Sequence, residues 1–334
     1  MTDETVLENR RVQRIAVYAG LVLLIIKFLA FFITNSNAIL SDALESIVNV
    51  GAGAFGLFAL RFSSRPRDYD HPYGHGKIEF LSAGFEGGLI LLAGLGIVGK
   101  SIYNFFEPQE LSQLDIGILL AGGAGLINYI LGFVLERKGK QNKSIVLVAG
   151  GKHLKSDAYT SLGLILGLAI VFWTGYVWLD NLVAIVFGVI IIYTGYKVLR
   201  QAFAGIMDEQ DPELIQDLVV NLNKKRQPDW IDLHNFRIIK YGAKLHIDCH
   251  LTIPWYYTVA EAHDTVEEFE NTVFDLEKNT LELFVHTDPC TPFSCNICQI
   301  KDCKVRQEPY IDKIDWKLQN VIENQKHNWS KEDK

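Results

Sequence analysis

Two pairs of metal-ligand side chains, each spaced four residues apart, lie in otherwise apolar segments. Glu45 and Asn49 form one pair, and His153 and Asp157 form the other. Residues four apart share one face of an α-helix, so each pair would present its donor atoms together. Two facing pairs would supply four oxygen and nitrogen ligands, a set suited to a divalent transition metal. Ionisable groups cost about 3 kcal/mol each in hydrocarbon on insertion scales, so their presence predicts a functional site.

The ligand types limit the choice of ion. Two carboxylates would neutralise a divalent cation, while His153 adds a neutral nitrogen and Asn49 a carbonyl oxygen. Four ligands including nitrogen favour Zn²⁺ over Mg²⁺ or Ca²⁺, and leave Fe²⁺, Co²⁺, Cd²⁺ and Mn²⁺ open. Because these groups lose protons when they bind metal, metal entry would expel protons. In the alternative interpretation Lys27 or Lys155 neutralises the carboxylates, and His153 is an interfacial histidine.

A polar loop over residues 68–77 could hold a second metal ion. Asp68, His71 and His75 are potential ligands, and the intervening Pro and Gly residues favour a turn that folds them inward. In the alternative interpretation the charges anchor a plain loop at the lipid surface.

The C-terminal part contains a third set of ligands. On a predicted strand, Leu245, Ile247 and Cys249 alternate with His246, Asp248 and His250, so one face is apolar and the other carries ligands. His234 on the preceding strand, and His286 with Asp288 on the last strand, could converge with His250; His263 lies on a predicted helix. Surface histidines without metal are the alternative.

Four of the five cysteines are clustered as Cys290, Cys295, Cys298 and Cys303. Four thiolates within so short a segment suit tetrahedral zinc, and in a cytoplasmic domain this clustering favours metal over disulfides. The first three also match the start of a plant-type iron–sulfur motif, but the fourth comes too soon. We predict a bound metal, with free thiols as the alternative.

Six apolar stretches are long enough to cross a bilayer. They cover residues 13–34, 37–61, 79–104, 114–135, 148–173 and 177–199. Basic residues precede the first stretch, lie between the second and third and the fourth and fifth, and follow the sixth, whereas the other loops are mostly polar or acidic. The positive-inside rule therefore predicts a cell inner or plasma membrane protein with both termini in the cytoplasm. The net charge of −7 argues against nucleic-acid binding.

The 334 residues, of which 49% are hydrophobic, divide into a membrane part and a soluble part. The predicted soluble elements are a helix (211–225), two strands (231–240 and 243–253), a helix (258–275) and a strand (280–287), a small α+β unit. We expect a cytoplasmic tail (1–12), a six-helix transport domain (13–200), a linker (201–210), an α+β domain (211–289) and a Cys-rich segment with a charged tail (290–334).

The chain resembles the cation diffusion facilitator family of metal–proton antiporters. The resemblance covers roughly residues 10–290 and depends on the six stretches, the paired ligands in the second and fifth, the His71–Glu79 motif His-Pro-Tyr-Gly-His-Gly-Lys-Ile-Glu, and the His-rich C-terminal domain. It implies a multi-pass helical membrane protein with a ferredoxin-like cytoplasmic domain, and a homodimer. The residues it implies are a transport site at Glu45, Asn49, His153 and Asp157, a loop site at Asp68, His71 and His75, cytoplasmic ligands at His234, His250, His286 and Asp288, and a dimer-axis ion pair between Lys77 and Asp208.

The first ligand pair departs from the family pattern. Zinc and iron exporters of this family usually have Asp or His followed by Asp, where this chain has Glu45 and Asn49. The loss of one carboxylate weakens the case for zinc. Glu86, in the third stretch, is a further intramembrane acid without an assigned role.

The expected function is secondary active export of divalent metal, with metal ions and protons as partners and no organic cofactor. The alternative is a membrane-anchored metal sensor that does not transport. An enzyme is disfavoured because the chain contains no His-Glu-x-x-His motif or similar paired-histidine site with a general base.

Overall fold

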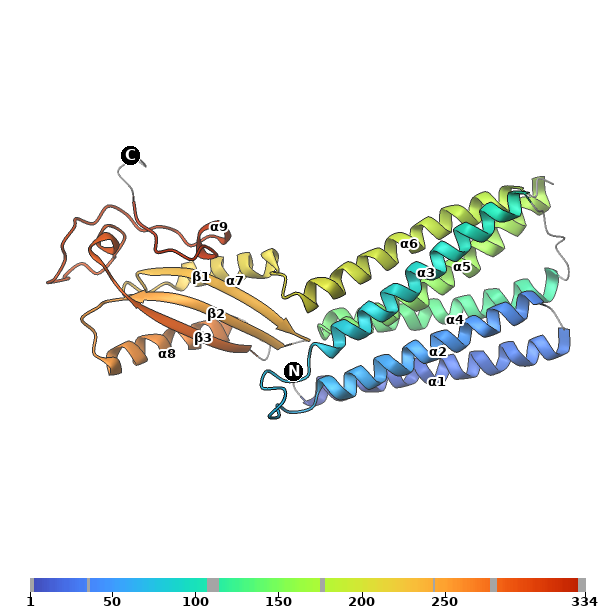
Figure 1. Ribbon diagram of the computed structural model, residues 1–334, viewed down its shortest axis with the longest axis horizontal. Coiled ribbons are helices and arrows are strands. Elements are labelled where there is room, and N and C mark those ends of the chain that lie inside the picture. Colours follow the sequence, from blue (N-terminus) through green and yellow to red (C-terminus); the bar gives the residue numbers. More distant parts are fainter. Residues whose placement is uncertain are drawn as a thin grey trace. The chain divides into compact units, whose positions relative to one another are not determined.

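The computed structural model describes residues 3–34, 37–106, 114–174, 178–242, 244–276 and 281–329. The chain divides into two compact units, Met1–Met207 and Asp208–Lys334, which are called unit 1 and unit 2 below. Figure 1 shows the long helices of unit 1 and the small sheet with its helices in unit 2.

Within its described residues, unit 1 consists of six long helices, as the hydropathy pattern predicts. They are α1 (Asp3–Thr34), α2 (Asn37–Ser63), α3 (Ile78–Phe106), α4 (Leu114–Gln141), α5 (Ile145–Thr174) and α6 (Trp178–Ile206). Helix α1 begins inside the expected N-terminal tail because polar contacts hold its first turns: Lys138 donates to Glu8 at 2.6 Å. Helix α6 continues into the expected linker because Ala202, which is fully buried, packs against Ala83.

The outer faces of these helices are apolar. Among the described residues, four stretches are long and apolar enough to cross a membrane: Glu4–Leu29, Ser46–Ser63, Ile78–Phe106 and Asn181–Ile206. Large apolar side chains such as Leu92 on α3 and Leu126 on α4 remain more than half exposed. So wide an apolar surface is unfavourable in water but is the expected lipid-facing surface of a helix bundle.

Small residues bring particular helix pairs together. A Cβ atom on Gly195 of α6 would lie 2.6 Å from the backbone nitrogen of Leu91 on α3, and one on Gly151 of α5 would lie 2.5 Å from the backbone nitrogen of Glu136 on α4. Helix α3 packs on α6, α4 on α5, and α1 on α2. Close helix contact of this kind is the usual role of glycine in membrane bundles.

Unit 2 has the predicted α+β organisation. Its main elements are α7 (Pro212–Lys225), β1 (Asp232–Tyr241), β2 (Lys244–Ile253), α8 (Val259–Leu276) and β3 (Leu281–Pro289), followed by the 3₁₀ turn η1 (Pro292–Asn296) and the short helix α9 (Leu318–Val321). Strand β2 lies in the middle of the sheet, antiparallel to β1 and parallel to β3. Each predicted helix or strand boundary in this unit is met within one or two residues.

The core of unit 2 forms between α7, α8 and the apolar face of the sheet. Asp211 caps α7 by accepting a hydrogen bond from the Leu214 N–H at 3.1 Å, and Pro212 occupies the first turn. Trp230 and Phe269 of α8 meet edge to face in the centre of this core, with ring centroids 5.2 Å apart. Full burial of side chains of this size contributes about 1.5–3 kcal/mol each.

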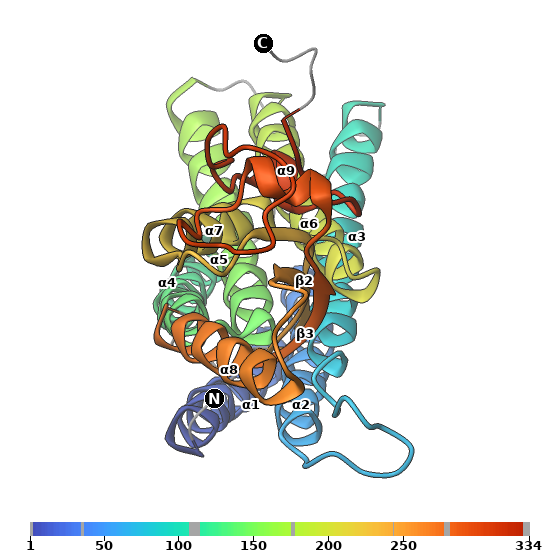
Figure 2. The same ribbon diagram turned by 90° about the vertical axis from the view of Figure 1, so that its left-hand side faces the viewer.

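The C-terminal tail belongs to the same core, although residues 290–334 were expected to form a separate segment. Trp316 and Val321 of the tail are 1% and 0% exposed and pack in the core. The tail, red in Figures 1 and 2, places α9 against β1, and the Glu323 carbonyl accepts a hydrogen bond from the Asn235 N–H at 2.7 Å. Its sequence is highly charged, so hydropathy alone does not reveal this packing.

A β-bulge in β1 sets which side chains face the core. Leu233 and Ile238 are both buried although they lie five residues apart, and strict alternation would place them on opposite faces. The ladder shifts between His234 and Arg237, and Asn235 within the bulge has φ +50°. Asparagine tolerates this left-handed backbone. The bulge therefore keeps the strand apolar inward while His234 stays on the other face.

Candidate functional site

Helices α2 and α5 bring three of the four predicted transport-site residues together. The Asn49 amide donates to Asp157 Oδ2 at 2.7 Å, and His153 Nε2 lies 2.9 Å from Asn49 Oδ1. His153 Nε2 and Asp157 Oδ2 are 4.0 Å apart. His153 is 7% exposed, so these donors lie in the interior of unit 1. The fourth predicted residue, Glu45, is on α2, but its side chain lies outside the described residues.

The structure does not pair Lys155 with Asp157, as the alternative interpretation would have it. Lys155 instead forms an ion pair with Glu136 of α4 at 2.8 Å. Lys27 donates to Ser46 at 2.9 Å, one turn before Asn49 on α2. Asp157 contacts Asn49 and His153, and all three side chains are of metal-ligand type.

Glu86 of α3 lies beside this group, a position that sequence reasoning did not assign. It lines the same cavity as Asn49 and His153. Its carboxylate faces Gly56 of α2 and Gly150 of α5, where an added Cβ would lie 3.4 and 3.3 Å from its two oxygens. Glu86 is 1% exposed, and its Oε2 has no hydrogen-bond partner among the described residues. The absence of side chains on the facing glycines makes room for this carboxylate.

The loop between α2 and α3 folds its three predicted ligands onto one another. Asp68 Oδ1 lies 3.0 Å from His71 Nδ1, and Asp68 Oδ2 lies 3.2 Å from His75 Nε2. One ligand atom from each residue falls within 4.8 Å of the others. The His71 hydrogen bonds lower the pKa of Asp68, which outweighs a small opposing effect of desolvation. His75 is buried against Phe62, with ring centroids 4.8 Å apart, whereas Asp68 and His71 are about half exposed.

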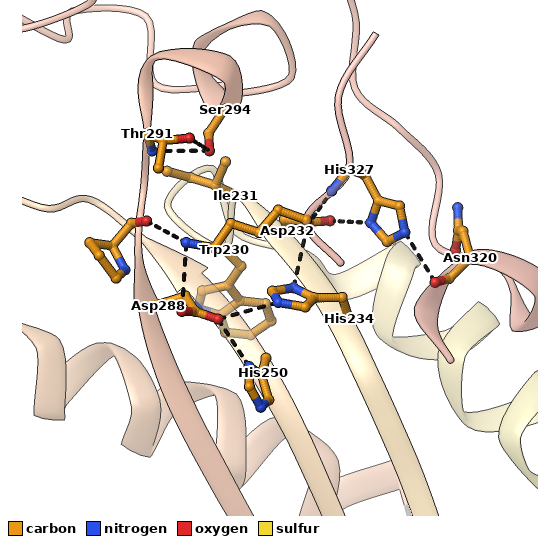
Figure 3. A network of polar contacts seen from close by, with 12 residues as sticks. Trp230, Ile231, Asp232, His234, His250, Asp288, Thr291, Ser294, Asn320 and His327 are labelled. Carbon is orange, nitrogen blue, oxygen red and sulfur yellow. Dashed lines mark hydrogen bonds and ion pairs between the residues drawn. The ribbon is translucent and has the colours of Figure 1, made fainter. Parts of the chain in front are cut away.

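In unit 2 the sheet register brings His234, His250 and Asp288 together (Figure 3). His234 of β1 is opposite His250 of β2, and β3 runs parallel beside β2. Asp288 Oδ2 lies 3.2 Å from His234 Nε2 and 3.0 Å from His250 Nδ1. Burial would raise the pKa of Asp288, but the hydrogen bond from His250 and the charge of Lys326 lower it. Two imidazoles and a carboxylate held in this way form a ligand set suited to a transition metal.

A buried carboxylate and a tail histidine support His234 from behind, and the sequence analysis did not identify either. Asp232, which is 1% exposed, lies 3.4 Å from His234 Nδ1 and 2.7 Å from His327 Nδ1 (Figure 3). Burial opposes ionisation of Asp232, but the nearby His234 ring and the hydrogen bonds from the His327 ring and backbone N–H hold its pKa well below the ordinary value. His327 also hydrogen-bonds to the Asn320 carbonyl at 3.0 Å. A carboxylate behind a ligand histidine fixes its ring orientation and raises its basicity.

The remaining predicted residues lie at the margin of this cluster or outside it. The His286 ring is 4.6 Å from that of His250 but is exposed and does not join the group of three. His263 is exposed on α8 and belongs to none of the ligand groups found in the described part of the chain. Lys77 and Asp208 lie in different units, which are described separately, so their ion pair stays a prediction.

The four clustered cysteines line one cavity in unit 2. None of them is in a disulfide, and no three of their sulfur atoms lie within 4.8 Å of one another. The fifth cysteine, Cys249, is buried in the apolar core. Burial raises its pKa well above the ordinary value, so it remains a neutral packing group.

Both units match known protein families. Residues 14–207 match the family model described as the cation efflux transmembrane domain, and residues 212–290 match that of the cation efflux protein cytoplasmic domain. The two matches cover nearly all of unit 1 and the part of unit 2 up to Cys290, the first residue of the cysteine cluster.

Curated proteins align over most of the chain. An uncharacterized transporter of Synechocystis sp. is 33% identical over 78% of this chain and 84% of its own length. The manganese efflux system protein MneP of Bacillus subtilis is 25% identical over 86% of this chain and 99% of its own length. The cation-efflux pump FieF of Salmonella arizonae is 26% identical over 85% and 94%. With an apolar helix bundle and its buried ligands followed by an α+β unit, the chain belongs to the cation diffusion facilitator family of membrane cation efflux proteins.

Proposed function

We propose that this transporter exports divalent transition-metal cations from the cytoplasm in exchange for protons. The observation that carries the proposal is the meeting of α2 and α5 at Asn49, His153 and Asp157 inside the apolar bundle. Metal ions are the cargo of this site. Buried polar groups of this kind in membrane helices mark ion pathways.

The hydrogen bonds at this site explain how metal and protons would compete. The Asn49 Oδ1 that faces His153 is a carbonyl oxygen and can only accept, so His153 Nε2 must carry the proton of that bond. A metal ion needs the lone pair of the same nitrogen, together with the oxygens of Asn49 and Asp157. Metal can bind Nε2 only when this nitrogen has given up its proton: a ring protonated on both nitrogens releases one proton as the metal binds, and return of that proton releases the metal.

Zn²⁺ is the proposed principal cargo, with Mn²⁺, Fe²⁺, Co²⁺ and Cd²⁺ as competitors. His153 favours zinc. Asn49 replaces a carboxylate by a neutral oxygen, and one relative is named as a manganese efflux protein. Oxygen ligands suit Mn²⁺, so the balance between these two ions depends on Asn49 and Glu45.

The other ligand groups fit accessory roles in a homodimer with both termini in the cytoplasm. We propose that the Asp68–His71–His75 loop binds metal near the cytoplasmic ends of α2 and α3. We also propose that His234, His250 and Asp288 hold a resident ion in the cytoplasmic unit, and that Lys77 pairs with Asp208 near the dimer axis.

Flux measurements distinguish transport from the alternative, a membrane metal sensor. Purified protein in liposomes, given an imposed proton gradient and each of the five metals in turn, should accumulate metal at a rate that depends on the gradient. Asp157→Asn should reduce this flux by at least about 100-fold, because it removes a ligand charge. Glu8→Gln, a matched change at the surface pair with Lys138, should leave flux unchanged. Wild-type protein that binds metal but moves none would favour the sensor.

A further inference from the structure

The cysteine cluster lies between the sheet and the C-terminal tail. Cys290 directly follows β3, and its N–H extends the ladder to the Ile253 carbonyl at 2.8 Å. Cys295 lies in η1, and Cys298 and Cys303 follow in the next loop. Side chains of all four line one cavity, together with Trp255 and Arg306. Residues separated by up to thirteen positions are thus gathered at one point of unit 2.

A single arginine shapes this loop. The Arg306 guanidinium donates to the carbonyl oxygens of Cys295 at 2.6 Å, Cys298 at 3.0 Å and Ile300 at 2.6 Å. These bonds wrap the backbone around the arginine while the cysteine side chains line the neighbouring cavity. Ile297 and Cys298 form a small apolar cluster with Ile231, and Cys290 and Ile300 pack against it. The fold of this segment therefore depends on polar contacts and one small cluster, a situation in which a metal ion can complete the structure.

The sulfur atom of Cys290 accepts a backbone hydrogen bond from the Trp255 N–H at 3.4 Å. Such a donor stabilises a thiolate, the form that binds metal.

The loop also contacts the tail segment that supports the His234 group. The Asn296 amide donates to the Trp329 carbonyl at 3.2 Å, and Trp329 packs on the small cluster around Ile231, Ile297 and Cys298. Two residues before Trp329, His327 binds Asp232, which contacts His234 (Figure 3). An ordered cysteine loop therefore helps to keep His327 in place.

We propose that Cys290, Cys295, Cys298 and Cys303 bind one thiophilic cation of the zinc type, which fastens the C-terminal tail to unit 2. Zn–S bonds of about 2.3 Å in a tetrahedron place the sulfurs about 3.8 Å apart. A change of side-chain rotamer moves a sulfur atom without rebuilding the backbone, and the four cysteines already line one cavity. The site is structural: it holds the tail, and through His327 it supports the ligand set at His234.

Cobalt substitution tests the proposal on full-length protein purified in detergent under reducing conditions. Co²⁺ bound by four thiolates shows sulfur-to-metal charge-transfer absorption, whereas the His and carboxylate sites of this chain contain no sulfur. We expect the absorption to saturate at one Co²⁺ per chain and to disappear when Zn²⁺ is added. The double variant Cys295→Ala/Cys298→Ala should lose it, and Cys249→Ala, a matched control in the core, should retain it.

A second measurement on the unmodified chain avoids dependence on variants that fold poorly. Zn²⁺ should protect the four cysteines from alkylation by iodoacetamide, as seen by peptide mass spectrometry. Strong chelation should restore alkylation and increase amide hydrogen exchange over residues 316–329. Absence of the charge-transfer band together with equal alkylation with and without Zn²⁺ would overturn the site. Unchanged exchange in the tail after metal removal would overturn its structural role.

Discussion

The ligand groups of the two units share imidazole and carboxylate donors but differ in what holds those donors. In unit 1, the ligands contact one another: Asn49 donates to Asp157 at 2.7 Å, and His153 hydrogen-bonds to Asn49 at 2.9 Å. In unit 2, His234 and Asp288 meet in a similar way, but the buried Asp232 also lies behind His234.

This difference teaches how one chain can move one metal ion and retain another. Ligands that hydrogen-bond to one another can return to those bonds when the metal leaves, so release costs less. A histidine held by a buried carboxylate is already oriented for metal, which favours long occupancy. This difference is consistent with the proposals of cargo exchange in unit 1 and stable binding in unit 2.

The largest expected effect comes from removing the shared imidazole in unit 1. His153→Gln should lower metal flux in liposomes by at least about 100-fold, because it removes the only ring nitrogen described in the site. The affinity of unit 2 for zinc, measured by titration of the same variant, should not change. Equal loss of both activities would show that the two ligand groups are not independent.

A smaller effect is expected from the support behind His234. Asp232→Asn should weaken metal binding by unit 2 by about 10- to 100-fold, since it removes the carboxylate that orients the ligand ring. Asp217→Asn, an exposed carboxylate on α7, is the matched control. Titration calorimetry on both variants measures the change, and near-wild-type affinity in Asp232→Asn would contradict the proposed support.

A moderate effect on flux is expected at Glu86. Glu86→Gln preserves shape but removes the charge that the carboxylate can add to the cavity, so transport should fall by about 3- to 10-fold. The loss should be greatest at low metal concentration, where attraction of the cation limits the rate. If flux is unchanged at every concentration, Glu86 serves packing alone.

The smallest effect is expected in the exposed loop. His71→Ala removes a partly solvated contact with Asp68, and such contacts are worth less than about 1 kcal/mol, so flux should change by less than about fivefold. Initial rates over a range of metal concentrations provide the measurement. A loss comparable to that of His153→Gln would place the loop on the obligatory path of the ion.

Much of the architecture could be predicted from the sequence because its signals are local. The apolar stretches mark α1–α6, and alternation of Leu245, Ile247 and Cys249 with polar residues predicts β2 and its buried face. The spacing of His153 and Asp157 places both on one face of α5, where they meet Asn49. The assignment of all three to transport stays a proposal.

The remaining features arise from contacts between distant residues. Asp232 looks like an ordinary polar residue at the start of a strand, and its partner His327 lies 95 positions away in a charged segment without periodicity. Glu86 was recognised as an intramembrane acid, but only the packing of α3 against α2 and α5 places it beside the transport group. Neither contact can be recognised from a pattern within a short stretch of the sequence.

The bulge at Asn235 constrains how β1 can change length. Asn235 is the extra residue, so removing it would leave Leu233 and Ile238 four positions apart, and plain alternation would then keep both toward the core and His234 on the other face. A single-residue insertion or deletion elsewhere in the strand would instead reverse the facing of every position beyond it. Natural variation in β1 should therefore include loss of the bulge residue, whereas other single-residue indels should be found in loops, such as the turn between β1 and β2, where they do not disturb the ligands.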